Sequence, residues 1–120
     1  MVEQLTPREL AALLQDRETA PLLLDVREPW EFSLCRIPGA RLLPMRQIPA
    51  ALIPPDPAWP EGEASDALDP ARPLVVICHH GIRSQQVALY LTHNGFQRVM
   101  NLQGGVAAWA AEVDPAMPTY

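Results

Sequence analysis

The stretch Leu74-Val-Val-Ile-Cys78-His-His-Gly-Ile-Arg83-Ser84 decides the fold, because one short loop joins two elements of different kinds. Its first four residues are apolar and too few for a helix, so they predict a buried strand. Ser84 and the Gln-Gln-Val-Ala-Leu-Tyr-Leu that follows predict a capped helix. Cys78 is therefore expected at the carboxyl end of a strand, on a loop that leads into a helix.

This setting favours the ionised form of the Cys78 side chain. A free thiol, with a pKa of about 8.5, is only slightly ionised at neutral pH, and both the amides at a helix start and a guanidinium stabilise the anion. Gly81 permits a tight turn in which several amides point inward, and Arg83 carries a planar fork suited to an oxyanion. The loop is predicted to hold a nucleophilic thiolate beside an anion site.

Helices and strands are predicted to alternate on both sides of this loop. Thr6-Pro-Arg-Glu9 is a capping box, and the continuous apolar run ending near Asp25 is typical of a strand covered on both faces. Alternation of this kind indicates an α/β fold with right-handed crossovers and a mainly parallel sheet, with the site at the carboxyl ends of the strands. In chain order we expect a helix over 7–16, a strand over 22–26, helices over 28–34 and near 47–53, strands over 40–43 and 74–77, a helix ending at 94–95, a strand over 96–102 and a helix over 106–112.

The chain length of 120 residues fits one domain with a single core. We expect this domain to span residues 1–114, with a proline-rich surface loop at 54–73 and a loose tail at 115–120.

Charge and composition restrict the partners and the location. The formal net charge is −5 and there is no lysine, so nucleic acid is not an expected partner. No apolar stretch approaches the roughly 18 residues of a membrane span, and Glu3 stands where a signal peptide would carry positive charge. We expect a cytoplasmic protein that does not bind membranes.

Two cysteines are too few for a framework of disulfides. Cys35 is expected to be a small buried hydrophobe, although a bridge to Cys78 stays open at this point. His79 and His80 are adjacent and lack the spacing of zinc ligands, so no metal and no cofactor is expected.

Four motifs occur in the order seen in rhodanese-like domains: Leu24-Asp-Val-Arg-Glu28, Ile37-Pro-Gly-Ala40, Cys78-x-x-Gly81-x-Arg83-Ser84 and Gly104-Gly-Val-Ala-Ala-Trp109. Over about residues 4–112 the chain resembles a single-domain thiosulfate sulfurtransferase. The resemblance implies a five-stranded, mainly parallel sheet flanked by helices on both faces. It also implies a cysteine that takes a sulfane sulfur from thiosulfate or a similar small anionic donor, holds it as a persulfide, and gives it to cyanide, a thiol or an acceptor protein.

Carried over by motif, Cys78 matches the sulfur-accepting nucleophile, and Asp25 and Arg27 match a supporting Asp-x-Arg pair. Arg36 stands where the family usually has histidine, so it would add a permanent cation if it lies near the pocket. The loop residues expected to contact the substrate are His79, His80, Gly81, Ile82, Arg83 and Ser84.

Other interpretations of the same residues stay open. Arg83 could pair with a carboxylate instead of a substrate, and Asp25 could cap a neighbouring turn. A phosphatase or arsenate reductase on the related fold also uses a cysteine, an anion nest and an arginine, but the four residues between Cys78 and Arg83 make a shorter loop than the phosphatase type. A non-catalytic regulatory module is the third interpretation, although such modules commonly lack the cysteine or the arginine.

Overall fold

Strands and helices alternate along the chain, as the sequence predicts. The computed structural model describes residues 2–48 and 70–119. Its elements are, in chain order, β1 (Glu3–Leu5), α1 (Pro7–Leu13), β2 (Leu22–Asp25), α2 (Pro29–Leu34), β3 (Arg41–Leu42), the 3-10 helix η1 (Met45–Gln47), β4 (Leu74–Ile77), α5 (Ile82–His93), β5 (Val99–Leu102) and α6 (Gly105–Glu112).

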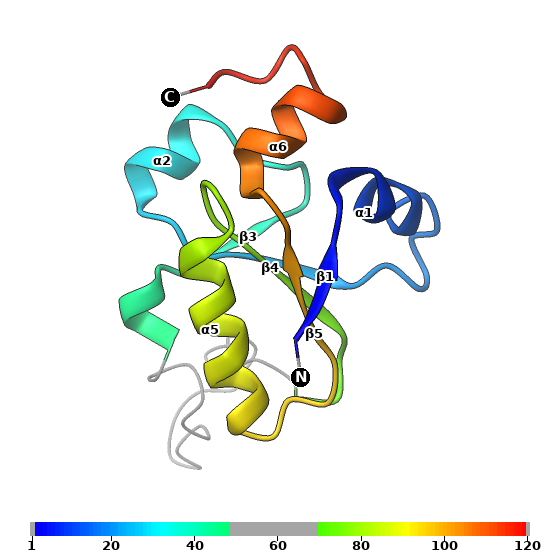
Figure 1. Cartoon of the computed structure of the whole chain (residues 1–120), viewed down its shortest axis with the longest axis vertical. Helices are drawn as coiled ribbons and strands as arrows, with labels where there is room; N and C mark the ends of the chain where they lie inside the picture. The colour runs from blue at the N-terminus through cyan, green and yellow to red at the C-terminus, as the bar shows by residue number, and fades with distance from the viewer. Residues whose placement is uncertain (1, 49–69, 120) are drawn as a thin grey trace, which may run out of the picture.

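The five strands form one sheet in the order β1-β5-β4-β2-β3, and each neighbouring pair is parallel (Figure 1). This confirms the predicted α/β fold with a parallel sheet. The pattern of the sequence did not indicate β1, because this strand has three residues and buries only Leu5. It pairs with Met100–Leu102 of β5 and closes one edge of the sheet.

Side chains alternate between the two faces of the sheet, and each face is covered by helices. Leu23, Val75 and Met100 belong to a cluster that includes residues of α1 and α6, whereas Leu24 and Val76 belong to a cluster with residues of α5. The strands are therefore buried on both sides, which explains their continuous apolar character. Helices on both faces were predicted, and this arrangement confirms them (Figure 1).

The start of α5 differs from the prediction. The helix begins at Ile82, directly after Gly81, which adopts a left-handed conformation with φ +94°. Ser84 therefore lies in the first turn and is not the capping residue. Because Gly81 already turns the chain into the helix, the Ser84 side chain is fully buried and faces inward.

Some boundaries also differ. α1 ends at Leu13 rather than at 16, and β5 begins at Val99 rather than at 96, since Gln97 donates its N–H to the Pro70 carbonyl outside the sheet. The tail expected to be loose from residue 115 packs at Met117, which is buried in the same cluster as Trp109.

Parts of two predictions lie outside the described residues. These are residues 54–69 of the proline-rich loop and the helical turns expected from 49 to 53. In the described part of the chain, η1 provides a 3-10 turn at Met45–Gln47. Within the same residues, none of the helices combines the length and the apolarity needed to cross a membrane.

Candidate active site

The carboxyl ends of three neighbouring strands bring the predicted site residues together. Cys78 follows β4, Asp25 ends β2, and Gly104 and Gly105 follow β5. Crevices at this end of a parallel sheet are where α/β folds bind ligands. The Cys78 side chain is buried, and its Sγ accepts a hydrogen bond from the Gly81 N–H at 3.0 Å.

Hydrogen bonds from the amino end of α6 hold the backbone of the Cys78 loop in place. The N–H groups of Val106 and Ala107 donate to the carbonyls of Cys78 and His79 at 2.9 and 3.1 Å. Since the carbonyl and the N–H of a trans peptide point in opposite directions, the N–H groups of His79 and His80 are turned away from α6. The loop thus has a fixed backbone orientation.

Gly105 is required for this close approach. A Cβ at this position would lie 2.3 Å from the Cys78 carbonyl oxygen and 2.4 Å from that of His79. Gly105 also has φ +61°, a region that L side chains rarely adopt. The close turn predicted at Gly104-Gly105 is confirmed.

Arg83 has a carboxylate partner in the structure. Its guanidinium donates two parallel hydrogen bonds to Glu31 on α2, at 2.8 and 2.9 Å. Glu31 is buried, whereas the Arg83 side chain is 37% exposed. The pair joins the first turn of α5 to α2 and offsets the positive charge that the sequence places beside Cys78.

Asp25 and Arg27 form a fully buried ion pair at 2.7 Å. The Asp25 carboxylate also accepts a hydrogen bond from the backbone N–H of Arg27. Asp25 therefore caps the turn after β2, which was one of the two roles that the sequence left open for it. The Arg27 guanidinium further donates to the Cys35 carbonyl at 2.5 Å. The pair therefore fixes the turn after β2 to the end of α2.

Arg36 lies at the surface, next to the end of α2. Its side chain is exposed, and its guanidinium lies 4.8 Å above the Phe32 ring. This contact places the Arg36 guanidinium against α2. The preceding residue points inward instead, because Ile37 and Cys35 are the buried positions of this segment.

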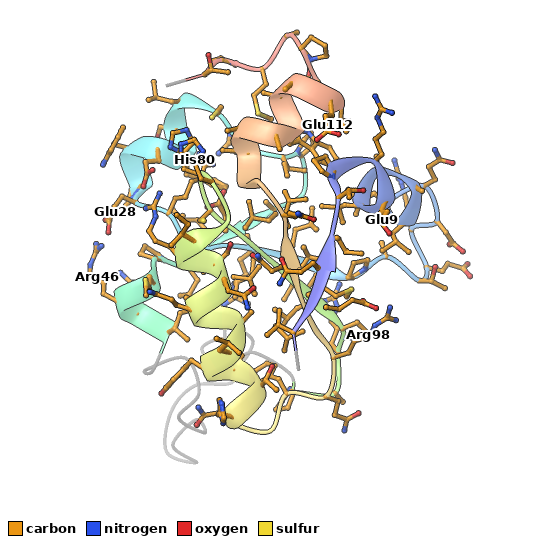
Figure 2. The ribbon with its side chains drawn as sticks, in the orientation of Figure 1. Glu9, Glu28, Arg46, His80, Arg98 and Glu112 are labelled. Atoms are coloured by element: carbon orange, nitrogen blue, oxygen red, sulfur yellow. The ribbon has the colours of Figure 1, made fainter. Side chains whose placement is uncertain are left out.

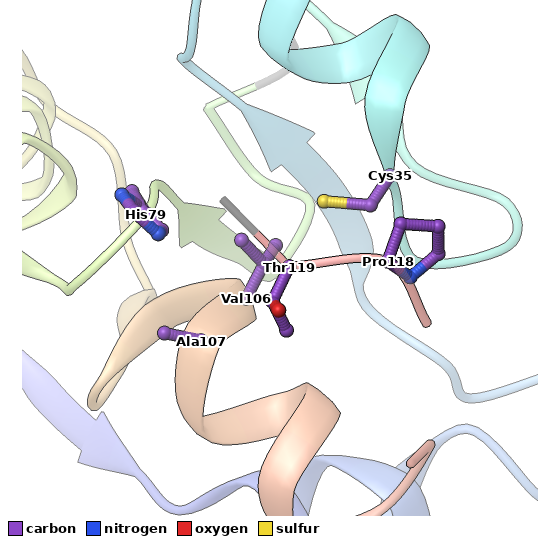
Figure 3. A pocket seen from close by; sticks show the side chains of 6 residues that line it. All are labelled: Cys35, His79, Val106, Ala107, Pro118 and Thr119. Atoms are coloured by element: carbon purple, nitrogen blue, oxygen red, sulfur yellow. The ribbon is translucent and has the colours of Figure 1, made fainter. Parts of the chain in front are cut away.

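Cys35 is buried, as predicted, and both Cys35 and Cys78 are free thiols. They belong to different core clusters, so the disulfide left open by the sequence does not form. Figure 3 shows the Cys35 sulfur directed into a small cavity that is also lined by His79, by Val106 and Ala107 of α6, and by Pro118 and Thr119 of the tail.

The two loop histidines stack at the outer side of the site. Their ring centroids are 3.9 Å apart, and His80 is exposed at the end of the molecule where α2 lies (Figure 2). Burial, followed by the charge of His80, lowers the pKa of His79 below its ordinary 6.5. His79 is therefore neutral at neutral pH. Among residues 2–48 and 70–119, the structure shows no group of three His, Cys, Asp or Glu side chains placed to hold a metal ion.

Sequence analysis missed two residues that contact this site, Glu31 and Asn101. Asn101 is buried in β5 and accepts a hydrogen bond from Ser84, whose hydroxyl oxygen lies 3.3 Å from the Cys78 Sγ. A polar residue inside the otherwise apolar Val99–Leu102 run was the available signal. Glu31 carried no comparable signal, because acidic residues are common in the first turn of a helix and Glu31 lies in the first turn of α2.

Comparison with known proteins gives one family. The family model for the rhodanese-like domain matches residues 6–112. A sulfurtransferase from Allochromatium vinosum is 38% identical over 112 residues, which cover 92% of this chain and 90% of that protein. A chloroplastic rhodanese-like/PpiC domain-containing protein 12 from Arabidopsis thaliana is 38% identical over 98 residues, 82% of this chain, but the chain spans only 30% of that relative's length.

Solved structures show the same architecture. The human single-domain sulfurtransferase TSTD1 superposes with a TM-score of 0.78 at 25% sequence identity, over 93% of this chain and 98% of the human one.

Proposed function

Because the chain belongs to the rhodanese-like domain family, we propose that it is a sulfurtransferase that carries a sulfane sulfur on Cys78. The observation that carries the proposal is the placement of Cys78. Its sulfur lies at the carboxyl end of β4 and accepts the Gly81 N–H, in a loop whose carbonyls are held by α6.

The proposed reaction has two nucleophilic displacements. The Cys78 thiolate attacks the outer sulfur of thiosulfate, so that an Sγ–S bond forms while the S–S bond of the donor breaks and sulfite leaves with its electron pair. Cyanide or a thiolate then attacks the terminal sulfur of the persulfide, takes it, and leaves Cys78 again as a thiolate. No external oxidant or reductant is needed.

Backbone groups favour both anions along this path. The Gly81 N–H already contacts the sulfur, and the amides of His79 and His80 are turned to the side of the loop opposite α6. The amino end of the twelve-residue helix α5 adds a partial positive charge next to the loop. Fixed donors of this kind stabilise developing charge without reorganisation.

We assign different roles to the other predicted residues. Exposed Ile82 and His80 and half-buried His79 form the mouth that an acceptor meets, whereas Gly81 and Ser84 contact the reacting sulfur. Arg83 acts mainly through Glu31, by holding α2 against the loop, since its guanidinium donates two hydrogen bonds to that buried carboxylate. Asp25 and Arg27 support the neighbouring turn.

Turnover with thiosulfate and cyanide tests the proposal. We expect the wild-type protein and Cys35→Ser to form thiocyanate at similar rates, and Cys78→Ser to form none, because a serine hydroxyl is far less ionised than a thiol. Hydrolysis of an aryl phosphate by the wild-type protein, without thiocyanate formation, would instead support the phosphatase interpretation. If the folded protein transferred no sulfur from any donor, the result would support the interpretation as a non-catalytic regulatory module.

A further inference from the structure

A chain of side-chain hydrogen bonds runs from the surface to the Cys78 sulfur. Gln4 donates to Gln85 at 2.6 Å, and Asn101 donates to Gln4 at 2.9 Å. Ser84 donates to the Asn101 Oδ1 at 2.5 Å, and the Ser84 oxygen lies 3.3 Å from the Cys78 Sγ. Ser84 and Asn101 are both buried, so water does not readily replace these partners.

The direction of this chain is fixed by a backbone carbonyl. The Asn101 Nδ2 lies 3.3 Å from the Gly81 carbonyl oxygen, which can only accept a hydrogen bond. The amide nitrogen must therefore face Gly81, and the amide oxygen must face Ser84. Because that oxygen has no proton to give, Ser84 has to donate its single hydroxyl proton to Asn101.

The same proton is then not available to Cys78. With its O–H directed at Asn101, Ser84 presents only lone pairs to the sulfur. Lone pairs suit a neutral thiol, which can donate its S–H, and they do not suit a thiolate, which needs a donor. Rotation of the Ser84 hydroxyl toward the sulfur would take from the buried Asn101 oxygen the donor that it has among the described residues, which is costly.

We propose that Asn101 is a positioning residue that directs the Ser84 hydroxyl away from Cys78 and thereby controls how readily this cysteine ionises. The proposal rests on the proposed function in taking Cys78 as the reactive thiol. In the persulfide, the inner sulfur is covalently bonded and carries no charge, so it does not require the Ser84 proton. The direction of the Ser84 O–H bond therefore disfavours the thiolate of Cys78 when no sulfur is bound, and it does not disfavour the persulfide.

Other titratable and charged groups surround the loop and are left unchanged in the test. They are His79 and His80 of the loop, Arg83 of α5 with Glu31 of α2, and the Asp25–Arg27 pair at the end of β2.

The test is the pH profile of Cys78 alkylation by iodoacetamide, measured in a Cys35→Ser background so that one thiol reacts. Asn101→Leu removes the acceptor and frees the Ser84 hydroxyl for the thiolate. A hydrogen bond to a charged group corresponds to about one pH unit, so we expect the midpoint of the profile to fall by about that amount. Ser84→Ala in the Asn101→Leu background should reverse most of this shift.

Two control variants complete the design. Ser84→Ala alone should move the midpoint by much less than Asn101→Leu does, and Gln85→Ala, which breaks only the outermost link, should leave the profile in place. If Asn101→Leu does not fold, Asn101→Ala removes the same acceptor with less bulk. A midpoint that rises by about one unit in Ser84→Ala alone, or that does not move in either Asn101 variant, would overturn the proposal.

Alkylation requires no sulfur donor, so this inference and the proposed function can fail separately. A shifted profile without thiocyanate formation would keep the role of Asn101 and reject the sulfurtransferase. Thiocyanate formation with an unshifted profile would support the sulfurtransferase and reject the role of Asn101.

Discussion

Cys78 and Cys35 are both buried free thiols, yet their surroundings are built from different parts of the chain. Backbone groups dominate around Cys78, where Gly81 donates to the sulfur and α6 holds the loop carbonyls. A charged side chain dominates around Cys35, whose sulfur lies 3.6 Å from the Arg27 guanidinium. Burial alone therefore does not separate the two thiols, whereas their partners differ: a backbone N–H contacts the Cys78 sulfur, and a guanidinium already paired with Asp25 lies near the Cys35 sulfur.

The largest expected effect belongs to the Cys35 region. Arg27→Leu removes the ion-pair partner of the fully buried Asp25, and breaking a buried pair in this way costs about 3–5 kcal/mol. Urea unfolding measures this loss. The double variant Asp25→Leu, Arg27→Met should recover most of it, because it leaves no uncompensated charge. A loss below about 1 kcal/mol for Arg27→Leu would contradict a structural role for this pair.

Gly105→Ala tests the backbone clamp of the Cys78 loop. The added Cβ would overlap two carbonyl oxygens, so we expect a loss of about 3 kcal/mol and a strong decrease of sulfur loading. Gly39→Ala is the matched control, since Gly39 also has positive φ but open space around it, and it should cost only about 1 kcal/mol. Equal losses for the two variants would show that the clamp does not depend on close approach.

Arg83→Ala separates anchoring from substrate binding. It leaves the buried Glu31 without this cation, and we expect a loss of about 2 kcal/mol, less than for Arg27 because Arg83 is more than a third exposed. Adding Glu31→Gln should recover about half of it. If Arg83→Ala left the stability unchanged but raised the thiosulfate concentration needed for half-maximal rate several-fold, Arg83 would instead bind the sulfur donor.

The smallest expected effect concerns His79. Because its pKa is lowered in the folded protein, the unfolded chain binds more protons as the pH falls below about 6.5, and the folded state loses stability over that interval. Comparison of the urea midpoints at pH 7.5 and at pH 5.5 should show a small decrease in the wild-type protein and a smaller one in His79→Gln. A decrease of the same size in both would assign the pH dependence to other groups.

The sequence was most informative where local chemistry decides the structure. Apolar runs located β2 and β4, the Thr6–Glu9 capping box located α1, and Gly104-Gly105 indicated the close turn that the structure shows. The start of α5 was placed three residues late, because a serine before a helical pattern is a common cap and Gly81 serves that purpose here.

Contacts between distant segments were beyond reach from the sequence. Glu31 and Arg83 are 52 positions apart, and Asn101 meets Ser84 only because β5 lies next to β4 in the sheet. β1 was missed since three residues with one buried side chain show no period. The loop that carries Cys78 could therefore be located from the sequence, whereas the partners that orient its side chains depend on tertiary structure.

The central claim is that Cys78, and not Cys35, carries the transferred sulfur, and intact mass after incubation with thiosulfate tests it most directly. We predict a gain of one sulfur atom in the wild-type protein and in Cys35→Ser, and no gain in Cys78→Ser. Sulfur retained on Cys78→Ser, or absent from a folded Cys35→Ser, would contradict the account.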